Sequence, residues 1–284
     1  MKIVVTGSGG QLGAALCRRF GPRAIGLDHA TLNIADRDAV QTAVDALRPD
    51  VVVNAAGFTA VDRAESDRQA CQAVNADAVD YLAEACAKQD ALLVQISTDY
   101  VFGGDASRSL PYDELDEPAP QGVYGQSKLA GEQQAAGCPR HLIVRTCGLY
   151  GRRRPGSRST NFVDAMLRLG AERDVVRVVD DQRCTPTYVE DLVGAIEFLI
   201  GSSAEGIYHV VNHGSATWYE FAAEIFRHRS IGTRLERITT AEYAAAAPRP
   251  AYSVLDTSKY HALGHLPMPD WHVALGRHLA DRQS

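Results

Sequence analysis

The feature that most constrains the fold is a glycine-rich turn directly after the first apolar segment of the chain. Residues 2–6 have the β-branched character of a buried strand, and they are followed by Gly7-Ser8-Gly9-Gly10-Gln11-Leu12-Gly13. Glycine permits a tight turn, and the helix that begins there offers free backbone N–H groups to a pyrophosphate. Asp28 follows the second expected strand, as an acid does in a dinucleotide-binding βαβ unit. The sequence therefore predicts a dinucleotide site at its start.

Short β-branched segments alternate with Ala-rich segments of helical length through the first two-thirds of the 284 residues. This alternation predicts an α/β protein with a Rossmann-type, doubly wound parallel sheet. The last third of the chain differs: it predicts a strand, a helix opened by Thr217 and a Pro-rich loop, and we expect it to form a smaller C-terminal substrate lobe. The expected strands of the sheet are 2–6, 24–27, 51–53, 91–97, 141–146 and 175–179, and the expected elements of the last third are 206–211, 217–228 and 247–253.

The same pattern suggests where the two parts meet. We expect residues 1–150 to form the dinucleotide-binding domain, with residues 171–200 returning to its sheet. Residues 151–170 and 201–284 would form the substrate-binding lobe, which closes over the carboxyl ends of the strands.

Composition excludes several classes of function. The net charge of −6 argues against nucleic acid as a partner, because phosphate contacts need clustered Lys and Arg. No apolar run approaches the length needed to cross a membrane, and the chain opens on a strand where a secretion signal would be charged and then apolar. The six cysteines, without a Cys-x-x-Cys pair, fit structural thiols in a reduced compartment, so we expect a cytoplasmic protein.

Tyr124 and Lys128 are the best candidates for chemistry. They are four residues apart, so on a helix they share one face. A phenol can pass a proton to a carbonyl oxygen, while a neighbouring ammonium lowers the phenol's pKa and can hold a ribose hydroxyl. Such a pair often arises by chance as a surface lysine beside a half-buried tyrosine. Its position after a dinucleotide loop and after a strand ending in Ser97-Thr98-Asp99 favours catalysis.

Several residues are candidates for holding the cofactor. The carboxylate of Asp28 can accept hydrogen bonds from the adenosine ribose, which favours NAD over NADP. Arg18 and Arg19 could contact a 2′-phosphate, although a solvated helix face is the favoured interpretation of both. The small residues after the third strand let a cofactor lie against the backbone, or they form only a tight turn. Asn75 fits either a cofactor site or a helix interior. The expected set is Gly7, Gly9, Gly10, Gln11, Leu12, Asp28, Ala55, Ala56, Gly57 and Asn75.

The order of the motifs resembles the extended short-chain dehydrogenase/reductases, and within them the dTDP-4-dehydrorhamnose reductase family. Arg145-Thr146 continues the resemblance, which covers essentially the whole chain. The segments that carry it are Gly7-x-x-Gly10-x-x-Gly13, Thr59-Ala60-Val61-Asp62-x-Ala64-Glu65, Ser97-Thr98-Asp99-Tyr100-Val101-Phe102, Tyr124-Gly125-x-x-Lys128 and Arg249-Pro250-x-x-Ser253-x-Leu255-Asp256.

The resemblance implies that NADPH or NADH passes a hydride to the C4 ketone of a dTDP-linked 6-deoxy-4-ketohexose, as in dTDP-L-rhamnose biosynthesis. It implies that Tyr124 protonates the forming alkoxide, that Thr98 hydrogen-bonds the same oxygen, and that Lys128 tunes Tyr124 and grips the nicotinamide ribose. Two fixed donors would then meet the oxygen on which charge develops. A homodimer is possible.

The resemblance also assigns binding residues. It adds Asn33 and Ile34, beside the adenine, and both Tyr124 and Lys128 to the cofactor site. It implies that Asp99, Tyr100, Cys147 and Gly148 line the sugar pocket and that Arg249 meets the diphosphate. The loop at residues 152–158, rich in arginine, could do the same or could simply be solvated.

Two departures from the family pattern bear on substrate and metal. The family commonly has Ser-Trp where this chain has Cys147-Gly148, so the pocket is expected to be more permissive unless another side chain fills the gap. Ala15 stands where some members have an acid that binds Mg²⁺, and Glu190 alone leaves that ion short of ligands, so we expect no metal. Glu190 and Asp191 are expected to flank a helix that begins there.

Three other functions are compatible with parts of this pattern. Related dehydratases carry Asp-Glu where this chain has Asp99-Tyr100, and a phenol is a poor base for a carbon-bound proton, which argues against dehydration. A reductase of a different nucleotide-linked 4-ketosugar stays open. A non-catalytic NAD(P)-binding regulatory subunit is the third alternative, and the joint presence of Thr98, Tyr124 and Lys128 favours an enzyme over it.

Overall fold

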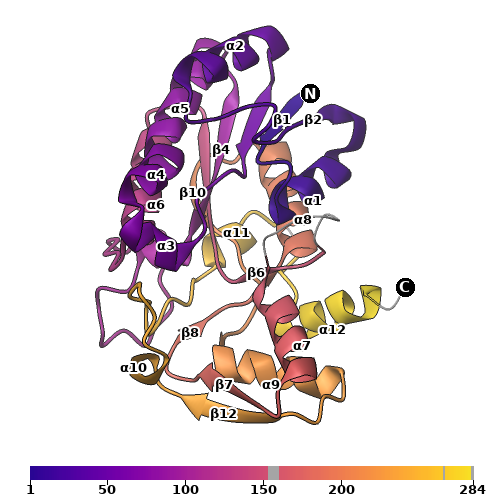
Figure 1. Ribbon diagram of the computed structural model, residues 1–284. Coiled ribbons are helices and arrows are strands. Elements are labelled where there is room, and N and C mark those ends of the chain that lie inside the picture. Colours follow the sequence, from indigo (N-terminus) through magenta and orange to yellow (C-terminus); the bar gives the residue numbers. More distant parts are fainter. Residues whose placement is uncertain (153–159, 265, 283–284) are drawn as a thin grey trace.

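The computed structural model describes residues 1–152, 160–264 and 266–282. Its larger part is built on a six-stranded parallel sheet in the order β10-β5-β4-β3-β1-β2 (Figure 1). The order reverses beside β1, which is the arrangement of a doubly wound sheet, and this confirms the fold class expected from the sequence. The strands are β1 (Ile3–Thr6), β2 (Ala24–Leu27), β3 (Val51–Asn54), β4 (Leu92–Thr98), β5 (His141–Thr146) and β10 (Gly206–His209).

Helices cover both faces of this sheet. One face packs against α1 and α8, and the other against α2, α5 and α6, so that two apolar layers sandwich the nearly continuous apolar strands (Figure 1). Two short helices and a π-helical turn lead into α5. The bounds are α1 (Gln11–Phe20), α2 (Arg37–Leu47), α3 (Val61–Ser66), α4 (Arg68–Gln72), η2 (Ala73–Asp77), α5 (Ala78–Lys88), α6 (Val123–Ala135) and α8 (Val189–Gly201).

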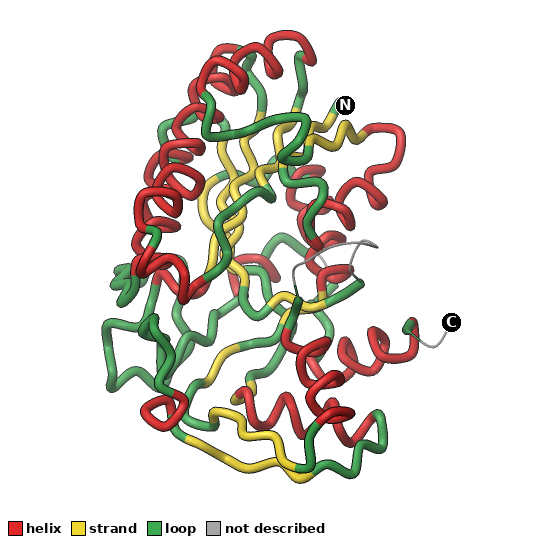
Figure 2. The backbone as a smooth tube through the Cα atoms, in the orientation of Figure 1, coloured by secondary structure: helices red, strands yellow, loops and turns green. Residues whose placement is uncertain are grey.

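The smaller part lies beyond the carboxyl ends of the strands and consists mainly of helices, loops and short strand pairs (Figure 2). Its apolar core gathers around Tyr150, Phe221 and Trp271. Thr217 closes a capping box with Glu220 at the start of α9, as expected for a helix over 217–228. The elements are β6 (Leu149–Tyr150), α7 (Phe162–Glu172), β7 (Val175–Val179), β8 (Arg183–Cys184), β9 (Thr187–Tyr188), β11 (Ala216–Thr217), α9 (Trp218–His228), β12 (Arg234–Ile238), α10 (Thr240–Tyr243), α11 (Ser258–His261) and α12 (Trp271–Asp281).

For two strands, the part of the structure predicted from the sequence is wrong. The segment 175–179 does not return to the large sheet: β7 pairs in parallel with β12 in the lobe. The sixth strand of the sheet is β10, within the segment expected in the lobe, and it pairs with β5 from Gly206↔Leu142 to His209↔Arg145. Of residues 171–200, only α8 packs on the sheet. A short apolar run does not encode its partner strand. The division into a cofactor part and a substrate part stays a prediction.

The turn after β1 owes its glycines to close packing. Gly7 has a φ of +65°, and a Cβ there would lie 2.6 Å from the backbone nitrogen of Ala56. A Cβ on Gly13 would lie 2.3 Å from the carbonyl oxygen of Gly7. A Cβ on Gly9 would lie at an ordinary contact distance of 3.5 Å from the Cβ of Asp28. Gly7 and Gly13 are therefore required by the fold itself.

Among the described residues, no helix combines the length and the apolar character that crossing a membrane requires.

These contacts predict different effects for two substitutions in one turn. Gly13→Ala forces the start of α1 away from Gly7 and should lower the free energy of unfolding by about 1–3 kcal/mol, the usual cost of overpacking. Gly9→Ala adds a methyl group at ordinary contact distance from Asp28 and should stay within about 0.5 kcal/mol of the wild type. Urea unfolding without cofactor measures both. Equal stabilities of the two variants would contradict the packing described for Gly13.

Candidate active site

The catalytic candidates meet at the carboxyl end of β4. Thr98 is the last residue of that strand, and the 3-10 turn η3 (Asp99–Val101) follows it. Helix α6 lies directly on this turn, because a Cβ on Gly125 would be 2.3 Å from the carbonyl oxygen of Tyr100. The rings of Tyr100 and Tyr124 are 5.7 Å apart, edge to face. The glycine of Tyr-Gly-x-x-Lys thus lets the first turn of α6 approach the end of β4.

Tyr124 and Thr98 form the centre of the site. Burial raises the pKa of the Tyr124 phenol, and a hydrogen bond with the Thr98 hydroxyl acts in the opposite direction. Thr98 also donates to Asp99 Oδ1 at 3.1 Å and accepts from the Tyr100 N–H at 3.2 Å. The phenol is therefore protonated at neutral pH and lies beside a second hydroxyl. The Tyr124 phenol can therefore give a proton to a substrate oxygen, and the Thr98 hydroxyl can hydrogen-bond the same oxygen from another side.

Lys128 is buried one turn further along α6. Its Nζ donates to the carbonyl oxygen of Ile96 at 2.5 Å. Burial lowers the pKa of Lys128 to about 8, while the carboxylate of Glu132 acts to raise it. The structure therefore brings Thr98, Tyr124 and Lys128 together from two elements that are distant in sequence.

Asp99 is held from three directions. Ser253, in the tail of the chain, donates to Asp99 Oδ2 at 2.5 Å. Burial raises the pKa of Asp99, and hydrogen bonds from Ser253, Cys147 and Thr98 oppose that rise. Cys147 also hydrogen-bonds Cys184 of β8. The carboxyl group thus joins β4, β5 and the tail.

Arg249 is engaged with another part of the chain. Its Nη1 and Nη2 donate to Asp62 Oδ1 and Oδ2 at 3.0 and 2.8 Å. This pair lowers the pKa of Asp62. Tyr100 is close enough to act on the pKa of Arg249. The guanidinium expected at the diphosphate therefore lies near the sugar-pocket candidates, with a carboxylate already bound to it.

The gap expected beside Gly148 is occupied. Gly148 has a φ of +53°, and a Cβ there would lie 3.4 Å from the Cη2 of Trp218 and 3.3 Å from the Cα of Pro186. Trp218, the first residue of α9, also packs against the ring of Phe162 and on the cluster that contains Cys147. No local pattern predicts this contact, because in the sequence Trp218 is only an apolar position of a helix in the lobe. A tryptophan side chain thus lies at this place, contributed by another segment.

The cofactor candidates gather around the first turn. Gly7 touches Ala55 and Ala56, and Gly9 faces Asp28. Asp28 Oδ1 accepts from the backbone N–H of Ala30 and Thr31, both at 3.1 Å. These contacts place the glycine turn beside the ends of β2 and β3, which is the crevice where a doubly wound sheet binds a dinucleotide.

Other candidates are taken up by the fold. Leu12 is in the core between α1 and the sheet, and Ile34 is in the core beneath α2. Gln11 Oε1 accepts from Asn161 Nδ2 at 3.1 Å, and the exposed Asn33 accepts from the N–H of Ala35. Any cofactor contact of Leu12 and Ile34 would be made through a small exposed part or the backbone.

Asn75, in η2, ties the turn after β3 to α6. Its Oδ1 accepts from the N–H of Phe58 at 2.8 Å, and its Nδ2 donates to the Phe58 carbonyl at 3.1 Å. The same Nδ2 donates to Ser127 Oγ at 3.0 Å. A Cβ on Gly57 would lie 3.3 Å from Asn75 Oδ1. Asn75 therefore fixes the shape of this loop, and its role at the cofactor stays a prediction.

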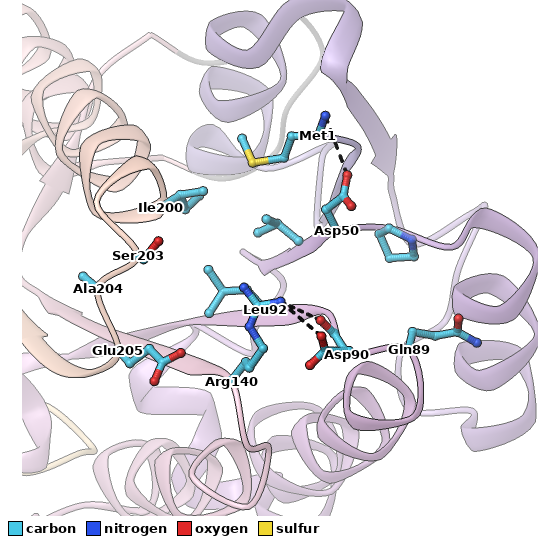
Figure 3. A pocket seen from close by; sticks show the side chains of 12 residues that line it. Met1, Asp50, Gln89, Asp90, Leu92, Arg140, Ile200, Ser203, Ala204 and Glu205 are labelled. Atoms are coloured by element: carbon cyan, nitrogen blue, oxygen red, sulfur yellow. Dashed lines mark hydrogen bonds and ion pairs between the residues drawn. The ribbon is translucent and has the colours of Figure 1, made fainter.

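A pocket at the opposite end of the sheet contains none of these residues. Figure 3 shows its lining, which includes Val51 and Leu92 at the amino ends of β3 and β4 and both apolar and polar side chains. Asp50 pairs with the N-terminal amine at 3.7 Å, and Arg140 donates to the carbonyl oxygen of Asp90 at 2.7 Å. This pocket is separate from the catalytic candidates.

Within the described part of the chain, no group of three or more His, Cys, Asp and Glu side chains could hold a metal ion. Ala15 is buried in the core, and Glu190, in the first turn of α8, accepts from Arg18 at 2.6 Å. Residues 153–159, most of the arginine-rich loop considered for a diphosphate, lie outside the described residues.

Comparison with known proteins identifies the family. The family model of the RmlD substrate binding domain matches residues 1–284. A dTDP-4-dehydrorhamnose reductase of Streptomyces griseus is 42% identical over 283 residues, which cover 96% of this chain and 91% of that protein. The spore coat polysaccharide biosynthesis protein SpsK of Bacillus subtilis is 39% identical over 287 residues, with 100% and 98% covered.

Comparison with solved structures supports the same family. The dTDP-4-dehydrorhamnose reductase of Bacillus anthracis, crystallised in complex with NADP, is 40% identical and superposes with a TM-score of 0.93 over 99% of this chain and 100% of that one. The chain therefore belongs to the dTDP-4-dehydrorhamnose reductase family and is an NAD(P)-dependent oxidoreductase of that type.

Proposed function

We propose that this protein reduces the C4 ketone of a dTDP-linked 6-deoxy-4-ketohexose with NADPH or NADH, as dTDP-4-dehydrorhamnose reductase in the synthesis of dTDP-L-rhamnose. The observation that supports this most is the half-buried, protonated phenol of Tyr124 hydrogen-bonded to Thr98, with Lys128 on the same face of α6. Charge develops on the ketone oxygen as hydride arrives, and fixed donors lower the barrier there.

Each residue has one part in this proposal. Tyr124 gives its proton to the C4 oxygen, and Thr98 hydrogen-bonds the same oxygen. Lys128, charged below a pKa of about 8, stabilises the phenolate left behind and reaches a hydroxyl of the nicotinamide ribose. The cofactor supplies the hydride.

The pyrophosphate is assigned to the N-terminus of α1, with Gly7, Gly9 and Gly10 allowing close approach. Asp28, facing Gly9, would meet the adenosine ribose. A relative that is 40% identical binds NADP. We propose that Asp28 biases the enzyme toward NADH without excluding NADPH.

The sugar would lie among Asp99, Tyr100 and Cys147, and we propose that Trp218 gives this pocket its aromatic wall. Its indole reaches Gly148, the residue after Cys147, at the carboxyl end of β5. Arg249, held by Asp62 near Tyr100, would meet the diphosphate. The likeness to SpsK, whose name gives a polysaccharide pathway without a sugar, supports a different nucleotide-linked 4-ketosugar as the second candidate substrate.

The proton donor is tested by Tyr124→Phe. Removing the phenolic oxygen should lower kcat by roughly 10²–10⁴ with little change in cofactor affinity. Tyr150→Phe is the matched control, because the Tyr150 hydroxyl is buried without a hydrogen-bond partner among the described residues. Oxidation of the reduced nicotinamide with dTDP-4-dehydrorhamnose gives the rates. Near-full turnover of Tyr124→Phe would rule out this assignment.

Cofactor choice is tested by Asp28→Asn, which keeps the oxygen that accepts from Ala30 and Thr31 and removes only the charge. The ratio of kcat/KM for NADPH to that for NADH should rise by on the order of 5- to 10-fold, as expected from about 1 kcal/mol of repulsion relieved near a 2′-phosphate. Asp38→Asn, an exposed acid on α2, should leave the ratio unchanged. A wild type with a large preference for NADPH would contradict the role of Asp28.

The aromatic wall is tested by Trp218→Ala. Loss of the indole should lower kcat/KM for dTDP-4-dehydrorhamnose by about 10- to 100-fold, mainly through KM. Tyr219→Ala is the control, because Tyr219 stacks with Arg237 instead. Gly148→Trp should be poorer on every sugar, since its backbone has a φ of +53° and the space is filled. A gain in efficiency for Gly148→Trp would show that the pocket is open after all.

A further inference from the structure

Helix α6 carries a further charged residue that the proposed chemistry does not use. Glu132 lies four residues after Lys128, so the two share one face of the helix. Its side chain is only 4% exposed. A carboxylate this deeply buried is stable as an ion only when charged and polar partners surround it.

Glu132 has such partners. Arg145 of β5, itself 2% exposed, donates from Nε to Oε1 at 2.9 Å and from Nη2 to Oε2 at 2.7 Å. Ser97 Oγ donates to Oε1 at 2.5 Å. This fork-to-fork geometry fixes the carboxylate in both position and orientation.

Two further contacts fix the guanidinium of Arg145 on the side away from Glu132. Its guanidinium carbon lies 5.0 Å from the ring of Phe102, and its Nη1 lies 3.3 Å from His209 Nε2. Burial and Arg145 lower the pKa of His209 to about 3, so the imidazole is neutral. Its Nε2 then accepts from Arg145, and its Nδ1 donates to the Tyr112 carbonyl at 3.0 Å. His209 therefore adds no charge to this network.

Strand β4 connects Glu132 to Lys128. Ile96 accepts from the Lys128 ammonium through its carbonyl oxygen, and the next residue, Ser97, donates to Glu132. The residue after that is Thr98. Three consecutive residues of one strand thus contact the ammonium, the carboxylate and the Tyr124 phenol.

We propose that Glu132 is a positioning residue for the reduction: its fixed carboxylate holds Lys128 in its charged form behind Tyr124. This inference rests on the proposed function, in which the ammonium stabilises the phenolate formed when Tyr124 gives up its proton. Arg145, Ser97 and His209 keep the carboxylate in place.

The groups around the ammonium support this role. On α6 they are Tyr124, one turn before Lys128, and Glu132, one turn after it, and on α4 the thiol of Cys71 also acts on the ammonium. Burial alone favours the neutral amine, and Glu132 is the strongest influence that raises the pKa of Lys128. Because the folded-state pKa is about 8, the charge is present below that pH and is lost as the pH rises through it.

The experiment compares the pH dependence of kcat/KM for three proteins with dTDP-4-dehydrorhamnose and reduced cofactor. In Glu132→Gln the charge of Arg145 remains and that of Glu132 is gone, so the alkaline midpoint should move down by about one pH unit or more. Activity at pH 8 should fall about tenfold relative to the wild type, and activity at pH 6 much less. In Glu132→Gln/Arg145→Met the midpoint should lie between those of Glu132→Gln and the wild type.

The double variant also guards against misfolding, because replacing both members of a buried ion pair is tolerated far better than removing one. If the single variant does not fold, the double variant must still have a lower midpoint than the wild type. A loss of activity by the same factor at every pH, or an unchanged midpoint in a folded variant, would overturn the role of Glu132. Absence of reduction by the wild type would instead reject the proposed function.

Discussion

The buried ion pair between Glu132 and Arg145 is the interaction on which the geometry of the site depends. It joins α6 to β5, and through Ser97 and His209 it reaches β4 and β10. Removing one partner of such a pair lowers the free energy of unfolding by about 3–5 kcal/mol, because the other partner is left as a buried charge without compensation. The pair therefore fixes the height and rotation of α6 over the sheet. The positions of Tyr124 and Lys128 relative to Thr98 follow from that.

Close backbone contacts complete the placement of α6. A Cβ on Gly131 would lie 2.1 Å from the carbonyl oxygen of Asn75, and Gly125 is as close to Tyr100. Glycines on two successive turns of one helix let it lie against η2 and η3 at backbone distance. Asn75 then links the loop after β3 to the same helix through Ser127. The carboxyl ends of β3 and β4 are thus held by one helix.

The tail of the chain closes the site by polar contacts. Ser253 donates to Asp99, and Arg249 binds Asp62 with both terminal nitrogens. These bonds span more than 150 residues of sequence. Asp62 would therefore compete for Arg249 with the diphosphate that is proposed to bind there. These contacts join the tail of the chain to the end of β4 and to α3, at the edge of the candidate pocket.

The sequence by itself determined the elements and their class. Local periodicity showed all six strands of the sheet as strands, although it assigned 206–211 to the lobe, and it showed the glycine turn and the helix at 217–228, because each depends on neighbours within a few residues. It also placed Thr98, Tyr124 and Lys128 in one site, since their spacing and order follow the strand and the helix; their roles remain predictions. Only the tertiary structure decided which strand completes the sheet, that Trp218 lies against Gly148, and that Glu132 pairs with Arg145. Those contacts depend on how distant segments pack, and no local pattern records which buried partner a side chain will meet.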